Sequence, residues 1–282
     1  MISGVGTHET VGAIYLHGAN NAVITHNKIT DTTGAGISLA DFFAPGTTGT
    51  QNNNAMIAYN YLDRVDTAGN DSGAIYILGR GQNANIHGTV TMNFIGAAGS
   101  ATAAQVVGIY LDDNAAGVTA TKNIVSASPA LSNAYEIHGG ANNTFSGNIF
   151  DLGTGSPTFG LSQRDEADQL PQGAFTQLTN DLVTGNIFVT ESATPRTPGF
   201  GDLTGGLGHV TITANDFWAY SNVGLNVGGS DAGGDSAARY NPPGPAAATT
   251  LSDYAGWSGA GINFAAIDTS QIGTAPVGPH AY

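Results

Sequence analysis

The sequence predicts an all-β solenoid, in which the chain is wound into a series of stacked turns. Seven short β-prone segments share one pattern: each ends in an asparagine, and an apolar residue follows two positions later. Their spacings of 33, 33, 30, 25, 38 and 29 residues are the irregular period of a repeat whose loops differ in length. The marker asparagines are Asn27, Asn60, Asn93, Asn123, Asn148, Asn186 and Asn215.

A second series of strand-like segments is interleaved with the first, so each turn is expected to hold at least two strands. These segments are rich in β-branched and aromatic residues, which favour a pleated surface. No long segment has the three-and-four spacing of an amphipathic helix, and a helical repeat is therefore not expected. The second series begins at Gly12, Gly36, Gly73, Gly108, Ala134 and Gly160.

The recurring asparagines have two physical explanations. Asparagine tolerates the left-handed backbone region better than other non-glycine residues, and its amide can bond to the same amide one turn above. A frequent turn former in a chain with 41 glycines is the simpler alternative, but seven equivalent placements make chance the weaker account. We therefore predict a stack of asparagine side chains at the corner of the coil.

Length and composition indicate one repeat domain with a looser tail. We expect parallel β-helix repeats over residues 1–229 and an irregular C-terminal segment over 230–282 that closes the last turn. Only 10% of the residues are charged, so Asn, Thr, Ser and Gly must supply the polar surface. Such a surface suits hydroxyl-rich ligands, and a polysaccharide or oligosaccharide is the natural candidate.

The charge excludes two classes of partner. The formal net charge is −14 with seven Lys and Arg, so binding to a phosphate backbone lacks the cations that it requires. The same deficit argues against anionic membranes, and no apolar run approaches the roughly 20 residues needed to span a bilayer. We expect no nucleic-acid partner and no membrane partner.

The compartment follows less directly from the sequence. Cysteine is absent, which excludes disulfides without fixing the compartment, and the first residues do not have the pattern of a signal peptide. We expect a secreted or periplasmic protein, of which this chain is the mature form or a part, with a cytoplasmic location as the alternative. Strands begin almost at once, so we also expect further turns, a capping domain or a partner chain at the N-terminal end.

The second series predicts two outward columns of side chains on one face of the coil. Core residues such as Ile75 and Ile77 alternate with residues that must point outward. Neighbours in a column lie about 4.8 Å apart if the turns stack like strands. One column reads Tyr15, Ser38, Tyr76, Tyr110, Glu136 and Ser162, and the next reads His17, Ala40, Leu78, Asp112, His138 and Arg164.

This face contains the candidate chemistry. Sugar rings stack on aromatic side chains, their hydroxyls bond to charged groups, and glycosidic cleavage needs two carboxyl groups. Asp71 fits a turn former as well as a site residue. The doubled acid Asp112 and Asp113 lies beside Tyr110 and favours a site over a strand-ending turn, with Asp113 also expected to bond to local backbone. Glu136 follows one turn later.

The histidines and arginines of this face are candidates for substrate contact. His17 and His138 each precede a glycine and a paired asparagine, a setting in which a structural role competes with a functional one, and His138 is expected to contact substrate or orient an acid. Arg80 and Arg164 are rare cations that either form ion pairs or bind a substrate anion. The acidic loop 164–169 either lines the rim of a cleft or is simply solvated.

Three segments carry a resemblance to a known group. The segments NDSGAIYILGRG, GIYLDDNAAGVTATKNIV and AYEIHGGANNTFSGNIF, in this order, resemble the core of bacterial right-handed parallel β-helix glycoside hydrolases, the group of β-helical xylosidases and the fucosidase/xylanase type. The closing TLSDYAGWSGAGINF resembles the end of those domains, so the likeness runs from about Gly12 to Asn263. It implies a right-handed parallel β-helix with Asp71 and Asp112 as the catalytic pair, or Asp113 in place of one of them. Sugar specificity is not implied.

Three functions therefore stand as expectations. The first is hydrolysis of a glycosidic bond in a plant or microbial polysaccharide by two carboxyl groups, with no required cofactor. The second is a polysaccharide lyase or uronate epimerase, for which Arg80, Arg164 or a Ca²⁺ ion on Asp71, Asp112 and Asp113 would neutralise the substrate carboxylate. The third is a carbohydrate-binding solenoid without catalytic activity.

Overall fold

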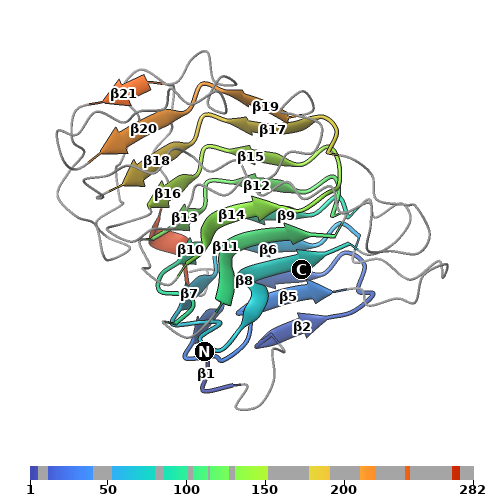
Figure 1. Cartoon of the computed structure of the whole chain (residues 1–282). Helices are drawn as coiled ribbons and strands as arrows, with labels where there is room; N and C mark the ends of the chain where they lie inside the picture. Colours follow the sequence, from blue (N-terminus) through green and yellow to red (C-terminus); the bar gives the residue numbers. More distant parts are fainter. Residues whose placement is uncertain are drawn as a thin grey trace.

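The computed structural model of the chain describes residues 1–5, 12–40, 53–79, 86–100, 104–113, 115–126, 131–151, 178–190, 210–219, 239–241 and 269–273. Within these ranges all regular structure is β-strand, apart from a 3-10 turn η3 at Thr269–Gln271. The strands form three sheets whose neighbours run parallel, which confirms the all-β prediction (Figure 1). No helix in the described ranges is long and apolar enough to cross a membrane.

The candidate site lies on a five-stranded sheet, here called sheet B. Its order is β14-β11-β8-β5-β2. The central strand β8 and its neighbour β11 have nine residues each and bend sharply along their length (Figure 1). The strands of sheet B are β2 (Ile14–Leu16), β5 (Ile37–Ala40), β8 (Asn70–Leu78), β11 (Ala104–Asp112) and β14 (Asn133–Ile137).

Two longer sheets complete the coil. The seven-stranded sheet C contains β3 (Val23–Thr25), β6 (Met56–Ala58), β9 (Thr89–Thr91), β12 (Thr119–Thr121), β15 (Thr144–Ser146), β17 (Asp181–Thr184) and β19 (Val210–Thr213). The nine-stranded sheet A contains β1 (Ile2–Ser3), β4 (Lys28–Thr30), β7 (Tyr61–Asp63), β10 (Phe94–Ile95), β13 (Ile124–Val125), β16 (Ile149–Asp151), β18 (Ile187–Thr190), β20 (Asp216–Ala219) and β21 (Arg239–Asn241).

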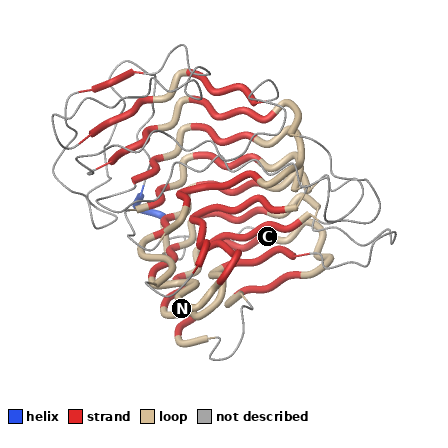
Figure 2. The backbone as a smooth tube through the Cα atoms, in the orientation of Figure 1, coloured by secondary structure: helices blue, strands red, loops and turns tan. Residues whose placement is uncertain are grey.

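The chain visits the three sheets in a fixed cycle. It passes from sheet B to sheet C and then to sheet A, as in β8, β9 and β10, and the next turn repeats the cycle in β11, β12 and β13. Each strand pairs with its counterpart one turn away, so the strands lie in stacked layers (Figure 2). The predicted coil of repeated turns, with at least two strands in each, corresponds to this path.

The core is formed by the inward side chains of all three sheets. The predicted pairs Ile75 and Ile77, and Ile109 and Leu111, are completely buried and lie in register on neighbouring strands. Ile14 and Leu16 are only partly buried, since β2 is the edge strand of sheet B. Burial of each such side chain contributes about 1.5–3 kcal/mol.

Aromatic residues fill the core in the middle of the coil. The Tyr135 ring lies 4.6 Å from that of Phe145 and 4.8 Å from that of Phe150, measured between ring centroids. Phe150 in turn stacks on Phe188 at 5.3 Å. Tyr135 is also the inward partner of Ile109 in sheet B, so these rings connect sheet B to sheet A.

The seven marker asparagines form the predicted stack. The backbone N–H and side-chain Nδ2 of each one donate to Oδ1 of the next, at 2.9 to 3.1 Å, from Asn27 through to Asn215. From Asn60 onward each Nδ2 also donates to a backbone carbonyl of the preceding turn. All six of these asparagines are fully buried, so the amide ladder satisfies polar groups that water cannot reach.

One of the two reasons given for these asparagines is wrong. The left-handed conformation belongs to the residue before each asparagine, and this position is held by His26, Tyr59, Met92, Lys122, Gly147, Gly185 and Ala214, at φ between 54° and 63°. Diverse residue types occupy it. Asparagine is therefore selected by the amide ladder, because no other uncharged side chain of its size both donates and accepts at this corner.

The structure describes two parts of the C-terminal segment. Strand β21 pairs with β20 and extends sheet A into the region predicted to be irregular. Residues 269–273 lie instead against β7 near the start of the coil, where the Gly273 N–H donates to the Tyr59 carbonyl at 2.8 Å. The rest of the segment that was predicted to close the last turn lies outside the described residues.

Candidate active site

The outward columns predicted from the sequence are present in sheet B. Register pairs Tyr15 with Ser38, Ser38 with Tyr76, Tyr76 with Tyr110 and Tyr110 with Glu136. Ala40, Leu78 and Asp112 follow one another in the second column, and His138 comes next, with its N–H bonded to the Leu111 carbonyl at 2.7 Å. Ser162, Arg164, Arg80 and the loop 164–169 lie outside the described residues.

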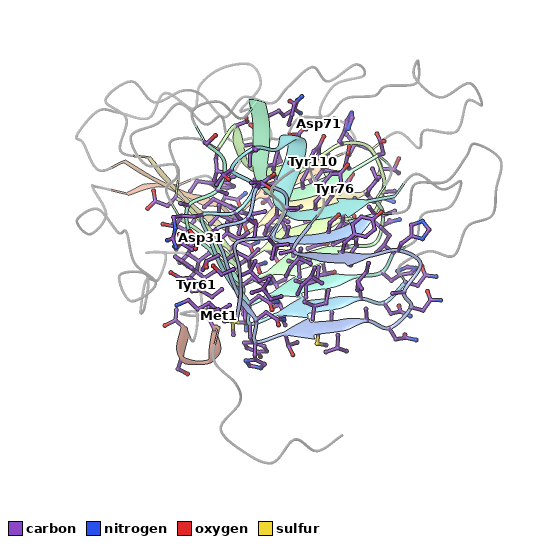
Figure 3. The ribbon with its side chains drawn as sticks, turned by 90° about the horizontal axis from the view of Figure 1, so that it is seen from below. Met1, Asp31, Tyr61, Asp71, Tyr76 and Tyr110 are labelled. Atoms are coloured by element: carbon purple, nitrogen blue, oxygen red, sulfur yellow. The ribbon has the colours of Figure 1, made fainter. Side chains whose placement is uncertain are left out.

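Two tyrosines connect the carboxyl groups of successive turns in a reciprocal manner. The Tyr76 hydroxyl on β8 donates to Asp112 Oδ2 on β11 at 2.6 Å. The Tyr110 hydroxyl on β11 donates to Asp71 Oδ1 on β8 at 3.2 Å. Figure 3 shows Asp71, Tyr110 and Tyr76 close together, away from Asp31, Tyr61 and Met1. Each turn therefore positions the acid of the other.

A local backbone feature brings Asp71 to this cluster. Asp71 has a left-handed backbone with φ of 55°, and Gln105 has a similar φ of 46° at the equivalent place on the next turn. An aspartate accepts this conformation more readily than most residues. Because β8 and β11 also bend, the start of each strand departs from the line of the sheet, and the exposed Asp71 lies within reach of the Tyr110 hydroxyl.

Asp112 is the centre of the hydrogen-bond network. Besides the Tyr76 bond, its Oδ1 accepts from His138 Nδ1 at 2.6 Å and from the Asp113 N–H at 2.8 Å. The side chain is only 5% exposed. Three bonds and burial hold both oxygens of this carboxylate in a fixed orientation, which is the preorganisation that a reacting group needs.

His138 joins the two halves of the cluster. Its Nδ1 lies 3.5 Å from the Tyr110 hydroxyl and 3.7 Å from Asp113 Oδ1, in addition to its bond to Asp112. Burial lowers its pKa, but the hydrogen bond with Asp112 and the charges of Asp112, Asp113 and Glu136 raise it more, and the net pKa lies above the usual value. Its Nε2 is buried and makes no hydrogen bond within the described part of the chain.

The two tyrosines act as neutral donors. Burial, followed by the negative charge of Asp112, raises the pKa of Tyr76 and of Tyr110 far above the ordinary tyrosine range. Tyr110 is almost completely buried, and Tyr76 is half-buried. The sequence predicted both as substrate contacts. In the structure their hydroxyls donate to the two candidate acids, and Tyr76 remains partly exposed.

Of the other predicted site residues, Glu136 belongs to this cluster and His17 does not. Glu136 is buried beside Tyr110 and accepts a 2.9 Å hydrogen bond from Asn133 Nδ2. His17 is exposed and follows the edge strand β2, three strands away from β11. The structure thus brings Asp71, Tyr76, Tyr110, Asp112, Asp113, Glu136 and His138 together on neighbouring turns, and it places His17 apart from them.

Sequence reasoning missed the buried supports of this cluster. Asn133 holds Glu136, and Ser72, next to Asp71, donates to the buried Asp66 at 2.5 Å. Burial raises the pKa of Asp66 to about 6, an effect that the Ser72 bond partly opposes. Asn133 pairs with the buried Val107 in sheet B, and this pairing depends on a strand register that the sequence alone did not reveal.

The cluster offers limited room for a metal ion. Asp112, Asp113 and His138 present ligand atoms within 4.8 Å of one another. Ca²⁺ prefers six to eight oxygen ligands, whereas both Asp112 oxygens already accept hydrogen bonds and the third group is an imidazole. Asp71, the remaining acid of the expected Ca²⁺ site, accepts a hydrogen bond from the Tyr110 hydroxyl. Three accepted hydrogen bonds occupy most of the lone pairs of Asp112, so the geometry fits a hydrogen-bonded site better than a calcium site.

Comparisons with known proteins add no family to this description. No protein-family model matches the chain, and neither a curated protein sequence nor a solved structure matches it significantly. The geometry of the described residues is therefore the basis for the functional proposal.

Proposed function

We propose that the protein is a glycoside hydrolase with a right-handed parallel β-helix fold, cleaving a glycosidic bond in a plant or microbial polysaccharide outside the cytoplasm. The observation that carries the proposal is the reciprocal pair of tyrosine–aspartate bonds on successive turns. It fixes two carboxyl groups on one face of the coil, and glycosidic cleavage requires two such groups on either side of the scissile bond.

The separation of the two carboxyl groups suits this chemistry. Contacts of 3.2, 3.5 and 2.6 Å lead from Asp71 through the Tyr110 hydroxyl and His138 Nδ1 to Asp112, which limits the distance between the bonded carboxyl oxygens to about 9 Å. Retaining enzymes have about 5 Å between these groups and inverting enzymes about 6.5–9.5 Å. This upper limit is compatible with the carboxyl separation of either mechanism.

The hydrogen bonds favour different roles for the two acids. Asp112 accepts three hydrogen bonds, two on Oδ1 and one on Oδ2, and these bonds hold the carboxylate in one orientation. This suits a base that activates water or a nucleophile that attacks the anomeric carbon. Asp71 is exposed and accepts one bond, from Tyr110, which leaves its second oxygen to carry the proton that the leaving sugar requires.

Assays on a panel of polysaccharides, with mass analysis of the products, test the proposal. Products that have gained one water are expected from the wild-type chain. Asp71→Asn and Asp112→Asn should abolish their release while glycan binding is retained. Asp31→Asn is the matched control, because this exposed acid pairs with Arg64 and lies away from the cluster.

Other outcomes would assign another function. An unsaturated, ultraviolet-absorbing product would establish a lyase, and an epimerised sugar without cleavage would establish an epimerase. Binding without turnover on every glycan in the panel would favour a carbohydrate-binding solenoid. Unchanged hydrolysis in both aspartate variants would overturn the proposed catalytic pair.

A further inference from the structure

The outer face of sheet C carries a regular array of hydroxyl side chains. Its seven strands pair one residue to one residue without a bulge, so the outward residues form two straight columns. In four of the five turns from β9 to β19, both columns present a hydroxyl. The first column is Val23, Met56, Thr89, Thr119, Thr144, Leu182 and Thr211, and the second is Thr25, Ala58, Thr91, Thr121, Ser146, Thr184 and Thr213.

Most of these hydroxyls are available to an external partner. Thr121 donates to Thr91 at 3.2 Å. The remaining eight hydroxyls of the array make no hydrogen bond within the described ranges, and every residue that bears one is partly or fully exposed. Thr119 and Thr211 are the most open of them. The array therefore presents hydrogen-bonding groups that the fold itself does not use.

The face is electrically neutral on an acidic protein. None of the fourteen positions holds a charged residue, although the chain has a formal net charge of −14. A neutral surface of methyl and hydroxyl groups complements a neutral ligand. Without charged groups, this face does not favour a cationic or an anionic ligand. None of the fourteen is aromatic, so the stacking platform that a sugar ring prefers is missing from these columns.

Side-chain hydrogen bonds link successive turns at both ends of the strands of the array. The marker asparagines follow the strands of sheet C, as Asn123 follows β12. A second series precedes the strands: the Val118 N–H donates to Asn143 Oδ1 at 3.0 Å, and the Asn143 N–H donates to Asp181 Oδ1 at 2.8 Å. These bonds help to keep successive turns in the one-to-one register of sheet C.

The spacing of the array approaches that of ice. Neighbouring strands lie about 4.8 Å apart, and alternate residues of a strand about 6.7 Å apart. Tetrahedral water with hydrogen bonds of about 2.75 Å repeats at about 4.5 Å in one direction and about 7.3 Å in the perpendicular one. Both mismatches are about a tenth or less, which is small enough for several consecutive rows to contact one lattice plane.

We propose that the outer face of sheet C binds ice. Threonine hydroxyls take the place of water molecules at the crystal surface, and the adjacent methyl groups exclude the remaining liquid water. The array is distinct from the candidate active site on sheet B and does not depend on the proposed hydrolase function. The alternative is that threonine occurs here because it favours exposed strands, in which case the face has no ligand.

The test is inhibition of ice recrystallisation by the purified chain, together with its partition into growing polycrystalline ice. The wild type is expected to keep ice grains small and to enter the ice. Thr119→Lys places a charge in the centre of the array and should abolish both effects. Thr119→Val keeps the shape and removes one hydroxyl, and it should weaken both. Ser270→Lys is the matched control in η3, outside sheet C, and should behave like the wild type.

Circular dichroism and thermal unfolding show whether each variant is folded, and Thr119→Val decides the test if Thr119→Lys is not. A wild type without effect on ice would overturn the proposal, as would folded Thr119 variants that retain full activity. A parallel assay measures binding to insoluble neutral polysaccharides. Binding there that is lost in Thr119→Lys, without any activity on ice, would assign the face to a glycan and likewise overturn the proposal.

Discussion

The Tyr76 hydroxyl and Asp112 Oδ2 are 2.6 Å apart, on strands that belong to successive turns of the coil. A single hydrogen bond thus couples the stacking of turns to the orientation of a candidate catalytic carboxylate. Tyr76 is not directly opposite Asp112 in the sheet, since its register partner is Tyr110 and that of Asp112 is Leu78. The long tyrosine side chain spans this diagonal.

Tyr76→Phe should lower hydrolytic activity mainly through kcat. The change removes one donor from Asp112 and leaves the ring in place, and a hydrogen bond to a charged group contributes about 1.5–3 kcal/mol. We expect a loss of roughly 10- to 100-fold in kcat/KM, measured on the best glycan of the panel. Tyr15→Phe is the control, since Tyr15 occupies the same column at the sheet edge. Equal activities of the two variants would show that the Tyr76 bond does not orient a reacting group.

Much of the fold could be predicted because it repeats. The marker asparagines gave the number of turns that now form the amide ladder, and the alternation of residues such as Ile75, Tyr76 and Ile77 gave the inward and outward columns of sheet B. Periodicity of two and stacking in register are local properties of a parallel sheet, so the column containing Tyr76, Tyr110 and Glu136 followed from them.

The arrangement of the site could not be predicted to the same extent. Neither the bend in β8 nor the left-handed backbone of Asp71 could be predicted from residue spacing, and both bring Asp71 within reach of Tyr110. The sequence also could not show that Tyr110 and Glu136, which belong to the outward column, are buried, because burial of an outward face depends on the rest of the chain. The bond partners of each side chain arise from tertiary geometry rather than from spacing.

Asp181 should make stability depend on pH. It occupies an amide position of the second ladder, where Asn143 donates to its Oδ1, but its Oδ2 is buried without a partner in the described structure. Burial raises its pKa from 3.8 to about 7, an effect that the Asn143 bonds partly oppose. Between about pH 4 and pH 7 the unfolded chain loses this proton while the folded chain keeps it, so the free energy of unfolding should fall as pH rises through that range.

Asp181→Asn should remove this dependence and continue the ladder with an amide. At pH 4 the variant and the wild type should be nearly equally stable, and at pH 8 the variant should be more stable by up to a few kcal/mol, since each pH unit accounts for at most about 1.4 kcal/mol. Urea unfolding at a series of pH values measures the difference. Asp31→Asn serves as the contrast, because the Arg64 hydrogen bond lowers the pKa of this exposed acid to about 2. A difference between Asp181→Asn and the wild type that is constant with pH would contradict the prediction.

Asn123→Ala should strongly destabilise the coil. Asn123 donates to Asn148 and to the Val90 carbonyl and accepts from the backbone and side chain of Asn93, all without access to water. Each buried group left unpaired costs about 1–3 kcal/mol, so the total loss should reach several kcal/mol. Asn27→Ala is the matched control at the open end of the ladder, where Asn27 is partly exposed and donates without accepting from another ladder asparagine. Comparable losses in the two variants by urea unfolding would show that position in the ladder does not matter.

Gly108→Ala and Gly147→Ala should separate steric overlap between β11 and its neighbours from ordinary backbone strain at the ladder corner. A Cβ at Gly108 would lie 2.3 Å from the Ala134 carbonyl oxygen and 2.8 Å from Val125 Cγ1, and the carbonyl cannot retreat without disturbing the pairing of β11 with β14. At Gly147 a Cβ meets nothing within 4 Å, and only the left-handed φ of 63° opposes it.

We expect Gly147→Ala to cost about 1 kcal/mol and to leave hydrolysis unchanged. Gly108→Ala should cost more, about 1–3 kcal/mol or above, and should also lower activity because β11 carries Tyr110 and Asp112. Chemical unfolding and kcat measured on the same preparations test both statements. A Gly108→Ala variant as stable and active as Gly147→Ala would mean that β11 does not require a glycine at this position.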